Sequence, residues 1–516
     1  MLIMRDEMNW SQKDLDALAE RGISADEIER QLRIFRSPPS PIVVIRPCKS
    51  GDGIVPMDLI DQERLSGLFN REAGKGRFSR FVPASGAATR MFRDLFDSHA
   101  ALEEWRLNCD YPSSPFHRQF FSGLTRFAFY PELSAVVRRQ GKNPEQLVKE
   151  RDLEPFIDAM LSSRGLDYGR TPKGLIPFHN DGMSSLTPLE EHLWETCRLL
   201  STCCSESSVH FTVSPDWQKN FADLATNTVR SIEAKTGFRI HVSFSCQDPA
   251  TDTIATTPDH QPFRTASGEL VFRPAGHGAL ISNLAATGSD LVLIKNIDNV
   301  VPGERQDDVN IWWRVVGGLL VELEETIREH WAALTRQAPG AVDSACAFLK
   351  DTFGYQPSKA CDNPADWALA RLNRPIRVCG MVRNTGEPGG GPFWVHTSEG
   401  VTRQIVELAQ LDQNDPKIRH MVADSTHFNP VFMACGLRNP AGERLDLQTF
   451  IDNDAIILTE KSIEGRPIRA LERPGLWNGA MAYWNTLFVE VPEEVFQPVK
   501  TVNDLLRPGH TTSADL

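Results

Sequence analysis

The stretch FVPASGAATRMF, residues 81–92, joins a strand-like apolar segment to a predicted helix through a turn of small side chains. Small side chains let a phosphate approach the backbone, and the free N–H groups of a helix that begins near Ala88 would attract it. Arg90 adds a fixed charge that can bind two phosphate oxygens at once. We therefore expect an anion-binding turn here, and an ordinary tight turn with a solvated arginine is the alternative.

A candidate cation follows in PKGLIPFHNDGMSSLTPLEEHL, residues 172–193. Lys173 comes directly after a proline, and Thr187, Pro188 and Glu190 have the spacing of a capping box with proline at the first helical position. The proline and the cap predict a constrained loop that holds Lys173. A functional cation and a surface lysine before an ordinary capped helix are both compatible with this pattern.

Polar residues that could contact a base or a sugar lie between residues 243 and 284. Gln247 follows a predicted strand, where its amide could read the Watson–Crick edge of a base. Gly276, His277 and Gly278 open a predicted helix, and glycine at such a place permits close approach of a ligand. A structural role is the alternative for His277.

A candidate metal ligand ends the buried segment LVLIKNIDNV, residues 291–300. Asp298 and Asn299 follow the predicted strand, and ligands of doubly wound sheets bind outside the carboxyl ends of the strands. A carboxylate at this place suits Mg²⁺, which keeps several waters and bridges phosphates. Asp298 and Asn299 are equally typical of a turn.

The elements that must position these residues alternate along the chain. Strand-like runs at 209, 240, 270, 291, 376, 404 and 455 alternate with helical patterns, including a long one over 309–336. This order predicts an α/β fold around a largely parallel mixed sheet flanked by helices. The predicted ranges are an N-terminal helical appendage (1–60), a catalytic body (61–460) with a helical insertion (93–168), and a C-terminal segment (461–516) packed on the body.

Composition limits the partners of the protein. The 516 residues carry 55 basic and 68 acidic side chains, a formal charge of −13, without long blocks of either sign. This balance argues against nucleic acid or an anionic membrane as the main partner. We expect a cytoplasmic protein, since no segment resembles a signal peptide or a membrane span. The ten scattered cysteines predict reduced thiols.

Taken in order, these motifs resemble those of the sugar nucleotidyltransferases, most closely the eukaryotic-type UDP-sugar pyrophosphorylases such as UDP-N-acetylglucosamine pyrophosphorylase. The resemblance rests on ASGAATRMF, PKGLIPF with TPLEEHL, SCQDP, RPAGHGAL, KNIDN and RQIVELAQLD, within residues 80–460. The strings GEPGGGPFWV and LWNGAMAYWNT are also similar to those of an uncharacterised bacterial family. Ser85 and Ala88 stand where the family has glycine in its turn. Serine and alanine would be unfavourable at these positions if the turn needs positive φ.

The resemblance implies a GT-A-like fold, an Mg²⁺ cofactor, and an NTP (UTP) and a phosphorylated small-molecule acceptor as partners. It implies the following residue roles: catalysis by Arg90, Lys173 and Asp298; nucleotide binding by Ser85, Gly86, Ala87, Ala88, Thr89, Gln247, Gly276, His277 and Gly278; contact with the acceptor by Glu407 and Asn429; and metal binding by Asp298 and Asn429.

The implied reaction is the formation of an NDP-sugar and pyrophosphate from an NTP and a sugar-1-phosphate. The attacking phosphate oxygen is already anionic, so positioning and charge stabilisation suffice and no general base is required. A metal-dependent glycosyltransferase with the same fold is an alternative, although the Thr89-Arg90 and Pro172-Lys173 pairs favour a triphosphate. A non-catalytic nucleotide or sugar-phosphate binding protein is the other.

Two further segments raise a choice between binding and packing. In GEPGGGPFW, residues 386–394, the glycines could let the backbone approach the acceptor while Glu387 binds its hydroxyls, or they could form only a flexible hairpin. In the aromatic segment 472–492, Trp477, Met481, Trp484 and Phe488 have the spacing of one buried helix face, and FVEV at 488–491 resembles a strand end. We expect the aromatic segment to pack in the core rather than to stack on a sugar.

Overall fold

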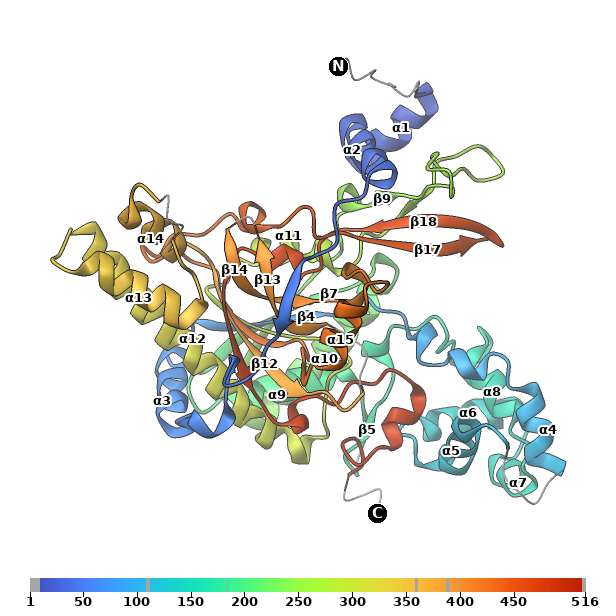
Figure 1. Cartoon of the computed structure of the whole chain (residues 1–516). Helices are drawn as coiled ribbons and strands as arrows, with labels where there is room; N and C mark the ends of the chain where they lie inside the picture. Colours follow the sequence, from blue (N-terminus) through green and yellow to red (C-terminus); the bar gives the residue numbers. More distant parts are fainter. Residues whose placement is uncertain are drawn as a thin grey trace.

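The computed structural model describes residues 10–107, 112–182, 184–357, 361–386, 390–397 and 399–512. A central sheet dominates this part of the chain (Figure 1). Its strands, in spatial order, are β2 (Lys49–Ser50), β3 (Gly53–Val55), β19 (Asn485–Glu490), β12 (Ile376–Arg383), β16 (Phe432–Gly436), β11 (Leu291–Lys295), β4 (Phe78–Pro83), β7 (Glu206–Thr212) and β8 (Arg239–Ser245).

The sheet is mixed and largely parallel, as the sequence predicts. Strand β16 runs antiparallel to β11 and β12, and the short β15 (His427–Phe428) runs antiparallel to β12. The other neighbouring pairs are parallel. Val, Ile, Leu and Phe fill the central strands because both faces of the sheet are covered.

Helices cover one face of the sheet and bury the largest apolar cluster. They are α3 (Gln62–Ala73), α9 (Pro188–Leu200), α10 (Gln218–Thr236), α12 (Gln306–Thr335), α13 (Ala341–Phe353) and α14 (Pro364–Leu372). The other face packs against α11 (Leu280–Ala286) and the segments around residues 447 and 476–484. The predicted capping box of α9 is present, with the side chains of Thr187 and Glu190 bonded to each other's backbone N–H.

Helices within the range predicted as an insertion form a lobe beside the sheet (Figure 1). It contains α4 (His99–Leu107), α5 (Pro115–Gly123), α6 (Tyr130–Arg139), α7 (Pro144–Glu150) and α8 (Glu154–Leu161), and it has its own apolar cluster. Val502 and Leu505 near the C-terminus belong to this cluster. The lobe is therefore tied to the end of the chain.

Smaller elements surround the body. The predicted N-terminal helices are α1 (Gln12–Arg21) and α2 (Ala25–Arg36), separated by Gly22 at φ 70°. They pack against β9 (Thr253–Ile254), β10 (Phe272–Arg273), and the hairpin of β17 (Ile457–Ile463) and β18 (Arg466–Glu472). A separate sheet consists of β1 (Val44–Pro47), β13 (Gly391–Thr397) and β14 (Gly400–Val406). The strands predicted near 404 and 455 thus lie outside the central sheet.

The C-terminal aromatic segment is buried, but it is not the helix that the spacing suggests. Met481, Trp484 and Phe488 are at most 1% exposed. A short 3₁₀ turn, Gly479–Met481, leads into β19, which pairs with β12 and β3. The run of β-branched and aromatic residues after Trp484 favours this strand. Residues from the predicted ranges 1–60 and 461–516 therefore contribute strands to the central sheet.

Short elements complete the described chain: β5 (His179–Asn180), β6 (Ser185–Leu186) and α15 (Pro416–Ala423). No helix among the described residues is both long and apolar enough to cross a membrane. Nine described cysteines are free thiols.

Candidate functional site

The central sheet has a topological switch point between β4 and β11. From β4 the chain goes to β7 and β8 on one side, and then crosses to β11 on the other side of β4. The connections after β4 and β11 therefore leave in different directions. We call the region at the carboxyl ends of these two strands the crevice, because ligands of doubly wound sheets bind at such a point. The predicted turn follows β4, and Asp298 follows β11.

The turn after β4 is held by the loop that carries Lys173. Ala88 N donates to Thr171 O at 3.1 Å, Thr89 Oγ1 donates to Gly169 O at 2.9 Å, and Lys173 N donates to Gly86 O at 3.3 Å. Ser85, Gly86, Ala87, Thr89 and Arg90 are exposed, whereas Ala88 is buried. The small side chains therefore present an accessible backbone at the crevice.

The prediction that an α-helix begins near Ala88 is wrong. Residues Ala88–Arg90 form a single 3₁₀ turn, and a second one covers Arg93–Leu95. The Ala88 N–H already bonds to the neighbouring loop, so it is not a free group at a helix N-terminus. No residue of the turn has positive φ. Ser85 and Ala88 therefore fit this backbone without strain.

Lys173 and Asp298 form an ion pair across the crevice. Lys173 Nζ lies 2.8 Å from Asp298 Oδ2, and the two side chains are 13% and 21% exposed. Lys173 Nζ also donates to the backbone carbonyl of Val499 at 2.5 Å. An ammonium group has three N–H donors. Asp298 and Val499 occupy two of them, and no other described residue accepts from the third, which could bind a ligand.

A buried charge network lies on the strands below the crevice. Glu195 of α9 accepts hydrogen bonds from Arg80 of β4, Lys295 of β11 and the indole of Trp313. Although burial opposes ionisation, Arg80 and Lys295 hold the pKa of Glu195 below its usual range. His192 Nε2 lies 3.2 Å from Asn296 O, on the segment leading to Asp298. Helix α9 therefore braces both strands of the switch point.

A second group of predicted residues meets around Glu407. His277 lies 3.7 Å from Glu407 Oε1 and stacks on Trp477, while Asn478 Nδ2 donates to the same oxygen at 2.7 Å. His277 Nδ1 accepts the N–H of Leu476 at 2.8 Å, which leaves Nε2 to carry the proton toward Glu407. The neighbouring His277 lowers the pKa of Glu407, although burial opposes this shift.

The remaining predicted residues have different surroundings. Gln247 is half-buried and donates to Thr251 and Asp252 of its own loop. Gly276 has φ 79°, and a Cβ on Gly278 would lie 2.0 Å from Pro474 O, so both glycines are required by the backbone. Glu387 lies outside the described residues.

Asn429 is 4% exposed and follows β15. Its Oδ1 accepts from Val431 N at 3.2 Å, while its Nδ2 is a buried donor without a partner in the described part of the chain. Strand β16 pairs Phe432 with Lys295, so Asn429 lies beyond the same edge of the sheet as Asp298.

The described residues offer few side-chain ligands for a metal ion. They contain no group of three or more His, Cys, Asp or Glu side chains that could hold an ion. Asp298 offers one carboxylate at the crevice, and Asn429 already uses its carbonyl oxygen within the protein. One carboxylate is compatible with Mg²⁺ that is bound mainly by waters and substrate phosphates.

Several residues of the site escaped sequence reasoning. Val499 contributes a backbone carbonyl, which no residue type signals. The sequence around Asn299 indicates only a turn, yet its side chain bonds to the backbone of residues 495 and 497. Glu195 lies on the helix that the capping box predicts, and a carboxylate among its apolar positions was the available signal.

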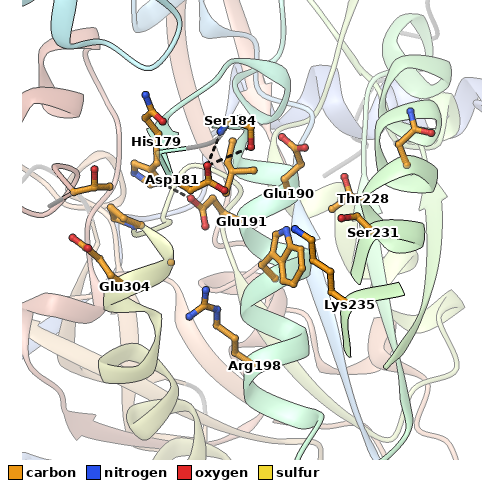
Figure 2. A pocket seen from close by; sticks show the side chains of 17 residues that line it. His179, Asp181, Ser184, Glu190, Glu191, Arg198, Thr228, Ser231, Lys235 and Glu304 are labelled. Carbon is orange, nitrogen blue, oxygen red and sulfur yellow. Dashed lines mark hydrogen bonds and ion pairs between the residues drawn. The ribbon is translucent and has the colours of Figure 1, made fainter. Parts of the chain in front are cut away.

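A separate cavity of about 670 Å³ lies between α9 and α10 (Figure 2). None of the predicted site residues lines it. In the view of Figure 2, Asp181, Glu190 and Glu191 lie in the upper half, Lys235 lies near the middle, and Arg198 lies near the bottom. The cavity adjoins the end of the chain, since Thr512 and His179 line it and His179 Nε2 lies 2.8 Å from His510 Nδ1.

Solved structures that match this chain in overall structure include the UDP-glucose pyrophosphorylase of Leishmania major. The two sequences are 13% identical, the TM-score is 0.47, and the match covers 96% of this chain and 78% of that one. Another is the UDP-glucose phosphorylase of Trypanosoma brucei, with 14% identity, a TM-score of 0.45, and coverage of 96% and 77%. At these values the similarity does not define the function of this chain.

No curated protein matches the sequence. A family model described as "Domain of unknown function (DUF4301)" matches residues 11–511, which is nearly the whole chain. The chain therefore belongs to the DUF4301 family.

Proposed function

We propose that this protein is a nucleotidyltransferase that forms an NDP-sugar and pyrophosphate from an NTP and a sugar-1-phosphate. The observation that carries the proposal is the Lys173–Asp298 pair at the switch-point crevice, beside an exposed turn of small residues. Phosphoryl chemistry of this kind depends on positioning and on charge stabilisation. The crevice offers a cation, an anion and an accessible backbone for this purpose.

The residues of the crevice divide the work between the two ends of the triphosphate. Lys173 stabilises the charge that develops on the α-phosphate, and Arg90, exposed at the end of the turn, holds the departing pyrophosphate. A phosphate oxygen of the sugar-1-phosphate forms a bond to the α-phosphorus, and the α–β phosphoanhydride bond breaks. The attacking oxygen is already ionised, so no proton has to be removed.

Asp298 is the proposed metal ligand, with Asn429 beyond the same edge of the sheet. Bound Mg²⁺ would neutralise phosphate charge and help to orient the triphosphate. When a triphosphate occupies the crevice, the ammonium of Lys173 keeps one N–H for it while Asp298 retains its second carboxylate oxygen.

Other residues are the proposed contacts of the base and the sugar. Gln247 and Gly276 are the proposed base contacts, and Glu407 is the proposed sugar contact, with its ionised carboxylate fixed by Asn478. UTP is the proposed nucleotide and UDP-N-acetylglucosamine is one proposed product, within a GT-A-like fold. Glu387 is kept as a proposed acceptor contact.

A pyrophosphate-release assay tests this function. Four NTPs are each combined with a panel of sugar-1-phosphates, including N-acetylglucosamine-1-phosphate, with and without Mg²⁺. The assay compares the natural protein with Lys173→Met and with Lys142→Met, a matched control at an exposed lysine of the insertion. We expect release with at least one pair, a loss of about 10²-fold or more in Lys173→Met, and an unchanged rate in Lys142→Met.

The alternatives give different outcomes. Release of a nucleoside diphosphate from an NDP-sugar, without pyrophosphate, would support a glycosyltransferase. Saturable nucleotide binding without turnover would support a binding protein. Equal activity of Lys173→Met and the natural protein would contradict the proposed role of Lys173.

A further inference from the structure

The C-terminal strap, which we define as residues 495–510, crosses the crevice. Val499 N donates to Asp298 O at 3.2 Å, and Pro498 pairs with Asn299 in an antiparallel bridge. The carbonyl of Val499 accepts from Lys173 Nζ. The strap therefore contacts the backbone of the proposed metal ligand and the side chain of the proposed catalytic cation.

Two buried asparagines fasten the strap. Asn299, 1% exposed, accepts from Gln497 N at 2.9 Å through Oδ1 and donates to Val495 O at 3.1 Å through Nδ2. Asn503, 5% exposed, donates to Phe116 O of the insertion at 2.9 Å. Asn299 lies next to Asp298, outside the strap, whereas Asn503 belongs to the strap and bonds to the insertion. Substitutions at the two positions therefore loosen the same segment at different places.

We infer that the strap is a positioning element of the proposed active site, with Asn299 and Asn503 as the positioning residues that hold the Val499 carbonyl against Lys173. An ammonium group on a four-carbon stem turns freely unless its acceptors fix it. Asp298 and Val499 together fix two N–H donors, so the third has a defined direction. The inference rests on the proposed function for its catalytic consequence only.

The strap does not have to leave the crevice before a ligand can reach Lys173. A cover that used all the donors of Lys173 would have to leave before a phosphate could bind. The strap uses one donor and Asp298 another, so a phosphate can bind the third while the strap stays in place. A hydrogen bond to a charged donor is also stronger than one between neutral groups, which favours a defined geometry.

The first experiment measures Lys173 without requiring catalysis. Acetic anhydride labels lysine amines, and mass spectrometry gives the initial labelling rate of Lys173 in the natural protein, Asn299→Ala, Asn503→Ala and Asn485→Ala. Asn485 is a matched control, because it is 0% exposed and donates to the carbonyl of Arg371 away from the strap. Asn299→Ala loses two hydrogen bonds to the strap and Asn503→Ala loses one. We expect each substitution to raise the rate by on the order of tenfold or more.

The control should label at the natural rate. A rise in Asn299→Ala alone would place the effect in the loop beside Asp298 and overturn the inference, as would an unchanged rate in both strap variants. If Asn299→Ala does not fold, Asn503→Ala decides by itself. This readout stands even if the protein has no transferase activity, so failure of the strap and failure of the proposed function are distinguishable.

The second experiment asks whether the strap acts through Lys173. Asn503→Ala should lower kcat on the order of 10²-fold with a smaller change in the KM for the NTP. In a Lys173→Met background the same substitution should change kcat little, because the group that it positions is absent. An equal loss of kcat in both backgrounds would overturn the inference.

Discussion

Substitution of Glu195 by glutamine tests the buried network under the crevice. Glu195 receives three hydrogen bonds: Arg80 and Trp313 donate to Oε1, and Lys295 donates to Oε2. The side chains of Arg80, Glu195 and Lys295 are at most 1% exposed. Glutamine keeps one acceptor oxygen, but it places an NH₂ donor against one of the cations and removes the negative charge.

The expected cost follows from this burial. Breaking a buried ion pair by removing one partner typically costs about 3–5 kcal/mol, and here two cations lose the same anion. An exposed pair is worth at most about 1 kcal/mol. Glu322 supplies the matched control, since it pairs with Arg64 at 2.7 Å with side chains 38% and 49% exposed.

Urea unfolding of the natural protein, Glu195→Gln and Glu322→Gln, followed by tryptophan fluorescence, gives the free energy of unfolding of each. We expect a loss of about 3–5 kcal/mol for Glu195→Gln and no more than about 1 kcal/mol for Glu322→Gln. Equal free energies for the two variants would refute the claim that Glu195 compensates buried charge.

Asp298→Asn should abolish Mg²⁺-dependent turnover while lowering the free energy of unfolding by at most about 1 kcal/mol, because its ion pair is partly exposed; equal loss of folding would favour a structural role. Trp484→Ala should cost about 3–5 kcal/mol in urea unfolding, because Trp484 is 1% exposed; a stable variant without acceptor binding would move this segment into the site. Burial lowers the pKa of His510 to about 3 from 6.5, so the unfolded state binds the extra proton and stability should fall as pH drops through this window. Unfolding between pH 7 and 4 should show a shallower fall for His510→Asn, by on the order of a few kcal/mol, and identical pH profiles would refute this assignment.

Sequence patterns predicted the parts of the fold that depend on local composition. The strands predicted around 209, 240, 291 and 376 and the capped helix after Thr187 are present, and helices occupy the range predicted as an insertion. The turn after β4 was predicted to start a helix, but the loop at 169–173 takes its first N–H group. The spacing from Trp477 to Phe488 predicted a helix face with a strand end at 488–491. Pairing with β12 and β3 instead begins the strand at Asn485, and no α-helix precedes it.

In the candidate site, too, the sequence predicts some residues and not others. Lys173 and Asp298 could be chosen from the sequence because their residue types and flanking motifs are visible, and the structure places them 2.8 Å apart. The carbonyl of Val499 could not be chosen, because it comes from a strap more than 300 residues along the chain from Lys173. Long-range backbone contacts leave no periodicity or residue-type signal in a single sequence.

The most direct test of the central claim is transfer of radioactivity from α-³²P-labelled NTP to a product that depends on a sugar-1-phosphate. We expect a labelled NDP-sugar, formed in equal amount with pyrophosphate, from the natural protein but not from Lys173→Met. Nucleotide binding at the crevice without any labelled NDP-sugar, across four NTPs and the sugar-1-phosphate panel in the presence of Mg²⁺, would contradict it.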